Sequence, residues 1–362
     1  MSKLQELIKE LCPEGVEFRK LGEVCEIKRG VRVVKNDLIN DGKYPVFQNS
    51  LIPLGYYDKN NYPANITFVI SAGAAGEIGY TEEPIWAADD CLAIISPNNI
   101  INKFIYYCLI ANKLFFVSKV RRASVPRLSR TVVDNFEIPI PPLEVQNEIV
   151  RILDTFTSHT AELQAELQAR KEQYEYYRNK LLTFDENDEG VKWMKLGEIG
   201  NVCSGKNKDK NPIGTYPVYG STGIIAYTEN YSYCDERILI ARVGANAGYT
   251  HVAFGKYDVS DNTLIVDLKE GVNLKYVYYT LVNLNLNKYA KGGGQPLITA
   301  GEIKTIQIPI PPLSEQQRIV SILDKFESLV NDLTAGLPAE IAAVQEQYEY
   351  YRNKLLAFER KS

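Results

Sequence analysis

Basic side chains gather at turn-like positions in both halves of the chain, where they could contact a polyanion. Arginine can pair with guanine through two hydrogen bonds, glutamine can pair with adenine, and lysine on a glycine-rich turn more often contacts phosphate. The candidates in the first half are Lys28, Arg29, Arg32, Lys35, Arg121, Arg122 and Arg127. The candidates in the second half are Lys206, Lys208, Lys210, Arg242, Lys291 and Gln295. One such cluster is typical of a solvated surface, but recurrence in both halves favours a polyanion partner.

Two short polar turns occupy matching places in the two halves and are further candidates for base contacts. They contain Asn49 and Ser50 in the first half, and Ser221 and Thr222 in the second. Tight hairpin turns use the same residue types, so base-reading loops and plain turns explain the pattern equally well. The net charge of −4 is unevenly placed, because the predicted helical segments are acidic and the parts between them are mildly basic.

The sequence offers little for catalysis or for binding a metal ion. Two histidines and six scattered cysteines give no zinc-binding pattern, and we expect reduced cysteines in a cytoplasmic protein. One alternative uses Asp261, Asp267 and Lys269, which have the spacing of a metal-dependent nuclease. The first half has no equivalent, and a strand with a polar end produces this spacing by chance. We therefore expect no catalytic residue, metal site or cofactor in this chain, and no membrane partner, since no apolar run reaches membrane-spanning length.

The segments that carry these residues occur twice. The segment Ile138–Leu143 recurs as Ile308–Leu313, and Gln173–Leu182 recurs as Gln347–Leu356. Between them, runs of β-branched and aromatic residues alternate with Gly, Asn and Pro, which is typical of short strands in an α+β module. Two copies that keep one scaffold but differ in their loops indicate two related binding domains with different targets.

A heptad pattern of apolar residues predicts two long helices. The seam of the first helix contains Ile149, Leu153, Phe156, Leu163, Leu167, Tyr174, Tyr177 and Leu181. The seam of the second helix contains Ile319, Leu323, Phe326, Val330, Leu333, Ile341, Tyr348, Tyr351 and Leu355. Regular spacing over this length favours an antiparallel coiled coil over packing of each seam on its own module. Gly336 and Pro338 predict a break in the second helix.

Five segments follow from these patterns. An N-terminal helix within residues 1–14 is expected to pack beside the C-terminal helix. The two strand-rich domains are predicted over 15–142 and 187–312, and the long helices over 143–186 and 313–362. The predicted fold class is α+β, with the two domains separated by the helices in a layout that is cyclic and pseudo-twofold.

The whole pattern resembles the specificity subunit of bacterial and archaeal type I restriction-modification systems. The resemblance covers nearly the whole chain and rests on three motifs, each present twice. They are Ile-Pro-x-Pro-Pro-Leu at 138 and 308, Gln-Tyr-Glu-Tyr-Tyr-Arg-Asn-Lys-Leu-Leu at 173 and 347, and Lys-Leu-Gly-Glu at 20 and 195. The resemblance implies that each strand-rich domain is a target-recognition domain for one half of a split site in double-stranded DNA, and that the helices set the distance between the halves.

The resemblance also implies partners and cofactors. The chain itself would be non-catalytic, while two modification subunits would bring S-adenosylmethionine and methylate adenine. Two restriction subunits can join such a complex and add ATP and Mg²⁺. A further alternative is a coiled-coil scaffold with sugar-binding or protein-binding domains, which salt-dependent DNA binding would distinguish from the first interpretation.

Overall fold

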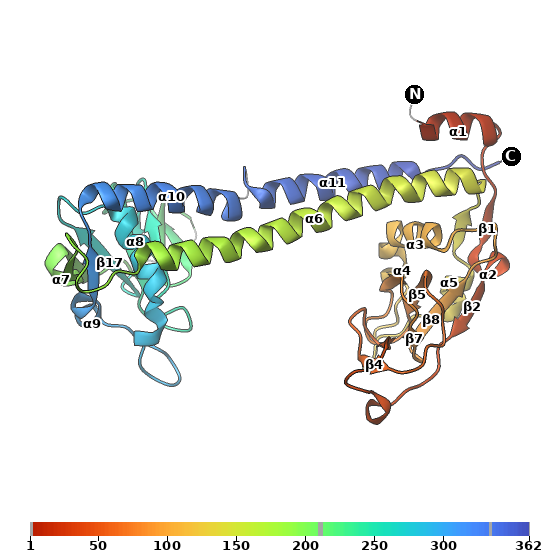
Figure 1. The fold of residues 1–362 in the computed structure, drawn as a ribbon, viewed down its shortest axis with the longest axis horizontal. Helices are drawn as coiled ribbons and strands as arrows, with labels where there is room; N and C mark the ends of the chain where they lie inside the picture. The colour runs from red at the N-terminus through yellow and green to blue at the C-terminus, as the bar shows by residue number, and fades with distance from the viewer. Residues whose placement is uncertain (1–2, 209–212, 333–334, 362) are drawn as a thin grey trace. The chain divides into compact units, whose positions relative to one another are not determined.

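The computed structural model describes residues 3–208, 213–332 and 335–361, and the chain divides into two compact units. Unit 1 comprises residues 1–164 and 340–362, and unit 2 comprises residues 165–339. Figure 1 labels the elements of each unit. None of the described helices is long and apolar enough to cross a membrane.

Two sheets form the centre of unit 1. The four-stranded sheet is antiparallel and has the order β2 (Glu26–Arg29), β8 (Cys91–Ile95), β5 (Ile66–Ile70) and β6 (Ile78–Thr81). The three-stranded sheet has the order β4 (Gly55–Tyr57), β3 (Tyr44–Phe47) and β7 (Trp86–Ala87), with β3 and β7 parallel. The short strands β1 (Phe18–Lys20) and β9 (Glu137–Pro139) pair with each other.

Strand β5 is buried along its whole length because it lies inside the four-stranded sheet with apolar layers on both faces. Val69 packs in one cluster with Phe104 of α3, whereas Phe68 and Ile70 pack in another with Ile85. The helices of this unit are α1 (Lys3–Leu11), α2 (Leu21–Val24), η1 (Lys35–Asp37), α3 (Asn102–Ala111), α4 (Lys113–Ser118) and α5 (Arg130–Asp134).

Unit 2 repeats this topology strand by strand. Its four-stranded sheet has the order β11 (Gly200–Ser204), β17 (Thr263–Leu268), β14 (Arg237–Ala241) and β15 (Thr250–Ala253). Its three-stranded sheet has the order β13 (Gly223–Thr228), β12 (Tyr216–Gly220) and β16 (Asp258–Val259), and β10 (Lys192–Lys195) pairs with β18 (Gln307–Ile310). The short helices are α7 (Leu196–Ile199), α8 (Leu274–Leu284), η2 (Leu286–Tyr289) and α9 (Ala300–Thr305). The predicted duplication of an α+β module is confirmed.

The predicted helix pairing is present within each unit. Helix α6 (Leu143–Leu182) contributes its first half to unit 1, where Phe156 stacks on Tyr351 of α11 (Leu337–Leu355) with ring centroids 5.6 Å apart. Its second half belongs to unit 2, where Tyr177 stacks on Phe326 of α10 (Leu313–Asn331) at 5.6 Å. The first half of α6 therefore contacts the later helix, α11, and its second half contacts the earlier helix, α10.

Most described seam residues are buried or half-buried, with two exceptions. Tyr177 and Tyr351 are 36% and 41% exposed, so each ring lies at the edge of the helix–helix interface and not in its buried centre. Leu333 lies outside the described residues. Helix α10 ends at Asn331 and α11 begins at Leu337, which places an interruption where Gly336 and Pro338 predict one.

The N-terminal helix packs in unit 1 beside the end of the chain. Leu4 of α1 is buried in a cluster to which Leu355 and Phe358 also pack. The backbone N–H of Val16 donates to the carbonyl oxygen of Glu359 at 2.8 Å. This contact joins the start of the first module to the segment that follows α11.

Candidate nucleic-acid interface

Three strand ends meet at one edge of the four-stranded sheet of unit 1. Arg29 at the end of β2 pairs with Leu92, and Ile70 at the end of β5 pairs with Cys91, the first residue of β8. Because β8 is antiparallel to both neighbours, the loops after β2 and β5 lie beside the turn that precedes β8. The loops that can differ between the two units without disturbing the core are therefore grouped at this edge.

A hairpin over residues 120–128 joins this edge. Arg121 and Arg127 exchange two backbone hydrogen bonds, with N–O distances of 2.9 and 3.1 Å. The N–H of Leu128 then donates to the carbonyl oxygen of Ser71 at 2.8 Å, which ties the hairpin to the loop after β5. The exposed side chains of this hairpin are thus held on an ordered backbone.

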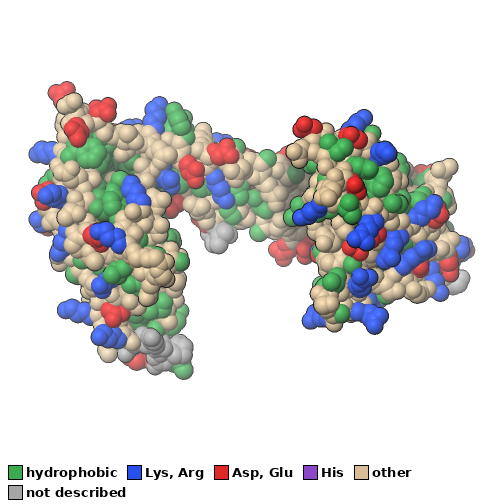
Figure 2. Space-filling view, turned by 90° about the horizontal axis from the view of Figure 1, so that it is seen from below, with side chains coloured by type: hydrophobic (Ala, Val, Ile, Leu, Met, Phe, Trp, Pro, Cys, Tyr) green, Lys and Arg blue, Asp and Glu red, His purple; other side chains and the backbone are tan. Residues whose placement is uncertain are grey.

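The turn after β3 lies against the same loop, because the N–H of Ala74 donates to the carbonyl oxygen of Asn49 at 2.9 Å. We call residues 30–34, 48–52, 71–76, 88–90 and 120–128 loop face 1. It brings together the predicted residues Arg32, Asn49, Ser50, Arg121, Arg122 and Arg127. In Figure 2, which is seen from below Figure 1, Lys and Arg side chains lie over the visible side of unit 1.

Three predicted residues of the first half lie at the margin of loop face 1 or off it. Lys28 is on strand β2 and forms an ion pair with Glu26, with 2.9 Å between Nζ and Oε2. Arg29 ends β2 directly before the loop. Lys35 begins η1, directly after the loop that follows β2. Charge clustering in the sequence does not distinguish a strand residue from the loop residues next to it.

Unit 2 forms the equivalent loop face. In its hairpin over residues 290–298, Lys291 and Leu297 exchange backbone hydrogen bonds at 3.0 and 2.9 Å, and the N–H of Ile298 donates to the carbonyl oxygen of Arg242 at 2.9 Å. The Ser221 hydroxyl donates to the carbonyl oxygen of Asn262 at 2.8 Å. We call residues 205–208, 220–223, 242–248, 260–262 and 290–298 loop face 2. It brings together Lys206, Lys208, Ser221, Thr222, Arg242, Lys291 and Gln295, whereas Lys210 lies outside the described residues.

The two hairpins share a backbone frame but differ in charge. Arg121 and Lys291 hold matching positions, since each exchanges backbone hydrogen bonds with the residue six positions later. The tip of the first hairpin carries Arg122, whereas the second has Gly292–Gly294, and Gly292 adopts a φ of +107° that favours glycine. Lys291 pairs with Glu302 at 2.7 Å, a contact that lowers the pKa of this carboxyl to about 2. Loop face 1 therefore has more unpaired positive charge on its hairpin.

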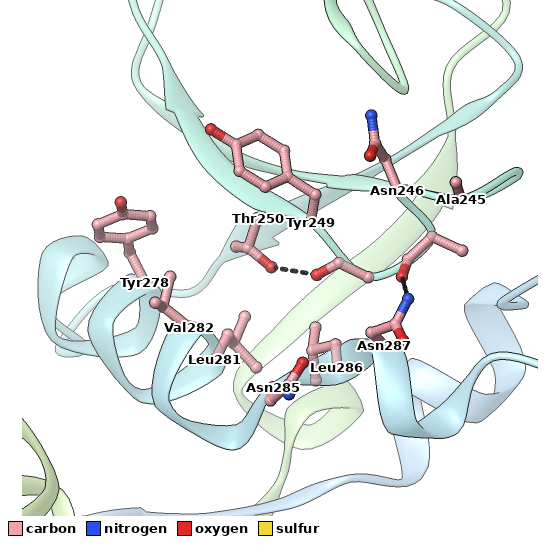
Figure 3. A pocket seen from close by; sticks show the side chains of 12 residues that line it. Ala245, Asn246, Tyr249, Thr250, Tyr278, Leu281, Val282, Asn285, Leu286 and Asn287 are labelled. Atoms are coloured by element: carbon pink, nitrogen blue, oxygen red, sulfur yellow. Dashed lines mark hydrogen bonds between the residues drawn. The ribbon is translucent and has the colours of Figure 1, made fainter. Parts of the chain in front are cut away.

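A pocket of about 360 Å³ lies beside loop face 2 and was not predicted from the sequence (Figure 3). It lies between the loop after β14 and the end of α8, and its lining includes Asn246, Tyr249, Tyr278 and Asn285. In unit 1 the chain after α3 continues into α4, where Lys113 pairs with Glu77 at 2.8 Å. In unit 2 α8 ends at Leu284, and Asn285 turns the chain with a φ of 49°. The shorter connection leaves this pocket open, and no charged residue lines it.

The structure separates the residues of the nuclease alternative. Asp261 precedes β17, whereas Asp267 lies near its other end, roughly 20 Å away at about 3.3 Å per residue. Asp267 pairs with Arg237 at 3.0 Å, and Lys269 donates to the carbonyl oxygen of Glu198 at 2.8 Å. In the part of the chain that the structure describes, no cluster of His, Cys, Asp or Glu could hold a metal ion.

Comparisons with known proteins agree with this architecture. The family model for the type I restriction modification DNA specificity domain matches twice, over residues 13–173 and 188–343. A putative type I restriction enzyme specificity subunit from Haemophilus influenzae is 33% identical over 95% of this chain and 96% of its own length. The EcoR124I/EcoR124II specificity subunit from Escherichia coli is 32% identical over 99% of this chain and 98% of its own length.

Two solved structures share the fold. The S subunit of a type I restriction-modification system from M. genitalium superposes with a TM-score of 0.67, covering 94% of this chain and 96% of that one, at 17% identity. A chain from a study of complex assembly and conformational transition of the type I restriction-modification system gives 0.64, covering 95% and 98%, at 19% identity.

Proposed function

The chain belongs to the type I restriction-modification DNA specificity family, and from this premise we propose that it reads a bipartite DNA site through loop faces 1 and 2. It is a specificity subunit and not an enzyme, in keeping with the names of its curated relatives. One observation supports the proposal. In two units of the same topology, backbone hydrogen bonds hold several loops and one hairpin together as one ordered face, while the side chains on the two faces differ.

Each face offers the two kinds of contact that a DNA-reading surface needs. Exposed arginines and lysines can neutralise phosphates and bring the salt-dependent part of the affinity. Asn49 and Gln295 can hydrogen-bond base edges from fixed backbone positions. Because the side chains of the faces differ, the two half-sites would have different sequences.

The long helices would set the gap between the half-sites. Helix α6 is continuous over 40 residues and contributes to both units. A helix of this length measures roughly 60 Å at 1.5 Å per residue, compared with roughly 34 Å for one turn of DNA. A stiff connection of this kind would favour one spacing and disfavour others.

The catalytic groups would come from partner subunits. We propose that two modification subunits bind the chain and supply S-adenosylmethionine for adenine methylation, and that two restriction subunits with ATP and Mg²⁺ can join them. The chain itself would hold no cofactor and would act in the cytoplasm.

Co-expression with the modification subunit of the same system, followed by genome-wide mapping of methylated adenine, tests the proposal. We expect one bipartite motif with a constant gap, and no such motif in cells that express the modification subunit alone. A continuous motif, or no methylation despite an assembled complex, would contradict the proposed function.

A further inference from the structure

Each loop face contains one buried polar atom without a hydrogen-bond partner. Among the side chains of the described residues, six buried nitrogen or oxygen atoms have no hydrogen-bond partner. Asp89 Oδ1 lies on loop face 1 and Arg242 Nε on loop face 2, whereas the other four atoms belong to His251, Thr263 and Arg352. A buried carboxylate or guanidinium nitrogen left unpaired costs stability, so such atoms are rare in native proteins. Of these residues, Asp89 and Arg242 are charged and lie half-buried on a proposed DNA-reading face, so the exposed part of each side chain can meet a ligand.

Asp89 lies in a rigid turn between β7 and β8. The N–H of Cys91 donates to the carbonyl oxygen of Ala88 at 2.9 Å, and the N–H of Ser71 donates to the carbonyl oxygen of Asp90 at 2.7 Å. The residue is half-buried, and none of the ion pairs among the described residues involves it. The backbone is therefore fixed while Oδ1 of Asp89 has no donor among the described residues, although exposed arginines lie on the same face.

Arg242 is the first residue after β14 and lies half-buried within loop face 2. Its N–H donates to the carbonyl oxygen of Asn262 at 3.0 Å, and its carbonyl oxygen accepts from Ile298 at 2.9 Å. The guanidinium makes one long contact, from Nη1 to the carbonyl oxygen of Asp261 at 3.4 Å. No carboxylate in the described part of the chain forms an ion pair with it, so the half-buried charge is not balanced locally.

The two unpaired groups lie on neighbouring loops of equivalent edges and have opposite hydrogen-bonding character. Arg242 follows β14 as Ser71 follows β5, and Asp89 precedes β8 as Asp261 precedes β17. Ser71 donates its hydroxyl to the carbonyl oxygen of Asp90 at 2.9 Å, so this hydroxyl is not a donor to Asp89 Oδ1. Both faces therefore carry a carboxylate before the strand, Asp89 or Asp261, and they differ at the other position, where loop face 1 has Ser71 and loop face 2 has Arg242.

We propose that Arg242 reads a guanine in one half-site and that Asp89 reads an exocyclic amino group, of cytosine or adenine, in the other. This inference rests on the proposed function. Guanine presents the acceptors N7 and O6 in the major groove, which match a guanidinium, whereas the amino groups of cytosine and adenine are donors that match a carboxylate. A carboxylate on a DNA-facing surface also repels guanine O6, thymine O4 and phosphate, so Asp89 selects by rejecting wrong bases.

The test uses Asp89→Asn and Arg242→Lys in the full complex with the modification subunit. Asp89→Asn removes the charge at nearly constant shape. Arg242→Lys keeps the charge but removes the planar guanidinium, which can donate two parallel hydrogen bonds. Methylation mapping should show that Asp89→Asn relaxes one position in one half-site and Arg242→Lys relaxes a guanine in the other. Discrimination at that position should fall about tenfold or more. Each variant is the folding and assembly control for the other, because the unaffected half-site should keep its wild-type sequence.

Binding of DNA without a target site gives a second measure that a merely structural role would not move. The affinity of the Asp89→Asn complex for such DNA should exceed that of the wild type, since a repulsive charge is lost. The inference is overturned if the wild-type complex methylates a bipartite motif and both variants keep every base of it. Loss of methylation without a change of motif also overturns it. A wild-type complex without a bipartite motif would instead refute the proposed function.

Discussion

The phenol of Tyr107 on α3 donates a hydrogen bond to Asp154 on α6, with 2.5 Å between Oη and Oδ1. Unit 2 repeats this contact between Tyr279 on α8 and Asp324 on α10, at 2.6 Å. In each unit the bond joins the module to a long helix, so it helps to determine how the loop face is held relative to that helix.

Replacing Tyr107 with Phe should lower the free energy of unfolding by about 1–3 kcal/mol, because a hydrogen bond to a charged group is lost in a buried site. Asp154 would keep its ion pair with Lys103, which limits the loss. Urea denaturation measures the effect. The control is Tyr56→Phe, at a residue that is 46% exposed and should change little. Equal stability of the two variants would show that the contact does not join module and helix.

The carboxylate of Glu148 makes stability depend on acid pH. Hydrogen bonds from Arg151 and then Lys3 lower its pKa to about 2. In the unfolded chain the pKa of a glutamate is near 4.3. The contribution of Glu148 to the free energy of unfolding is therefore complete above about pH 4.3 and is lost as the pH falls toward 2. Urea midpoints should therefore separate the wild type from Glu148→Gln at pH 5, and this separation should shrink at pH 3. Glu144→Gln, at an exposed residue of the same helix, is the control. A constant separation across this range would contradict the assignment.

Gly30 should not tolerate a side chain. A Cβ there would lie 2.2 Å from the carbonyl oxygens of both Ala87 and Ala88, so the loop after β2 would have to move away from the turn that holds Asp89. We expect Gly30→Ala to destabilise unit 1 by about 1–3 kcal/mol, measured by thermal denaturation. Gly293→Ala meets no atom within 4 Å and is the matched control. A stable Gly30→Ala protein with normal DNA binding would show that this close approach is dispensable.

Removing Arg121 and Arg122 together should weaken DNA binding by the assembled complex at every sequence. If both contact phosphate, the slope of log affinity against log salt should decrease by about 2. Fluorescence anisotropy at several salt concentrations measures both quantities. The double variant Lys9→Ala and Lys20→Ala removes the same charge from exposed sites outside loop face 1. Unchanged affinity at physiological salt would remove the two arginines from the interface.

Asp267→Ala should leave DNA intact and change stability by less than about 1 kcal/mol, because its ion pair with Arg237 is half exposed. Arg237 keeps its contact with Asp235 at 2.9 Å. Incubation of plasmid DNA with the isolated chain and Mg²⁺ measures cleavage. Magnesium-dependent cleavage that the substitution abolishes would revive the nuclease alternative.

Features with a local signature could be predicted from the sequence. The duplicated segments at 138 and 308, the heptad spacing through Ile149 and Leu153, and the break at Pro338 all depend on neighbouring residues, and the structure contains each of them. The hairpin arginines were candidates because charge clustering is also visible locally. The sequence does not show that Lys28, another candidate, lies on a strand and pairs with Glu26.

Contacts between distant segments were decided only by the tertiary structure. Asn49, Ser71 and Arg127 come together because an antiparallel sheet brings three strand ends to one edge. Asp89 Oδ1 and Arg242 Nε have no partner because none of the residues around them places a suitable hydrogen-bonding group there. The pattern of residues along the sequence cannot show that such a group is missing. The sequence by itself therefore determined that there are two modules and two long helices. The fold decided which side chains share a face, because that depends on strand register and loop contacts between residues far apart in the chain.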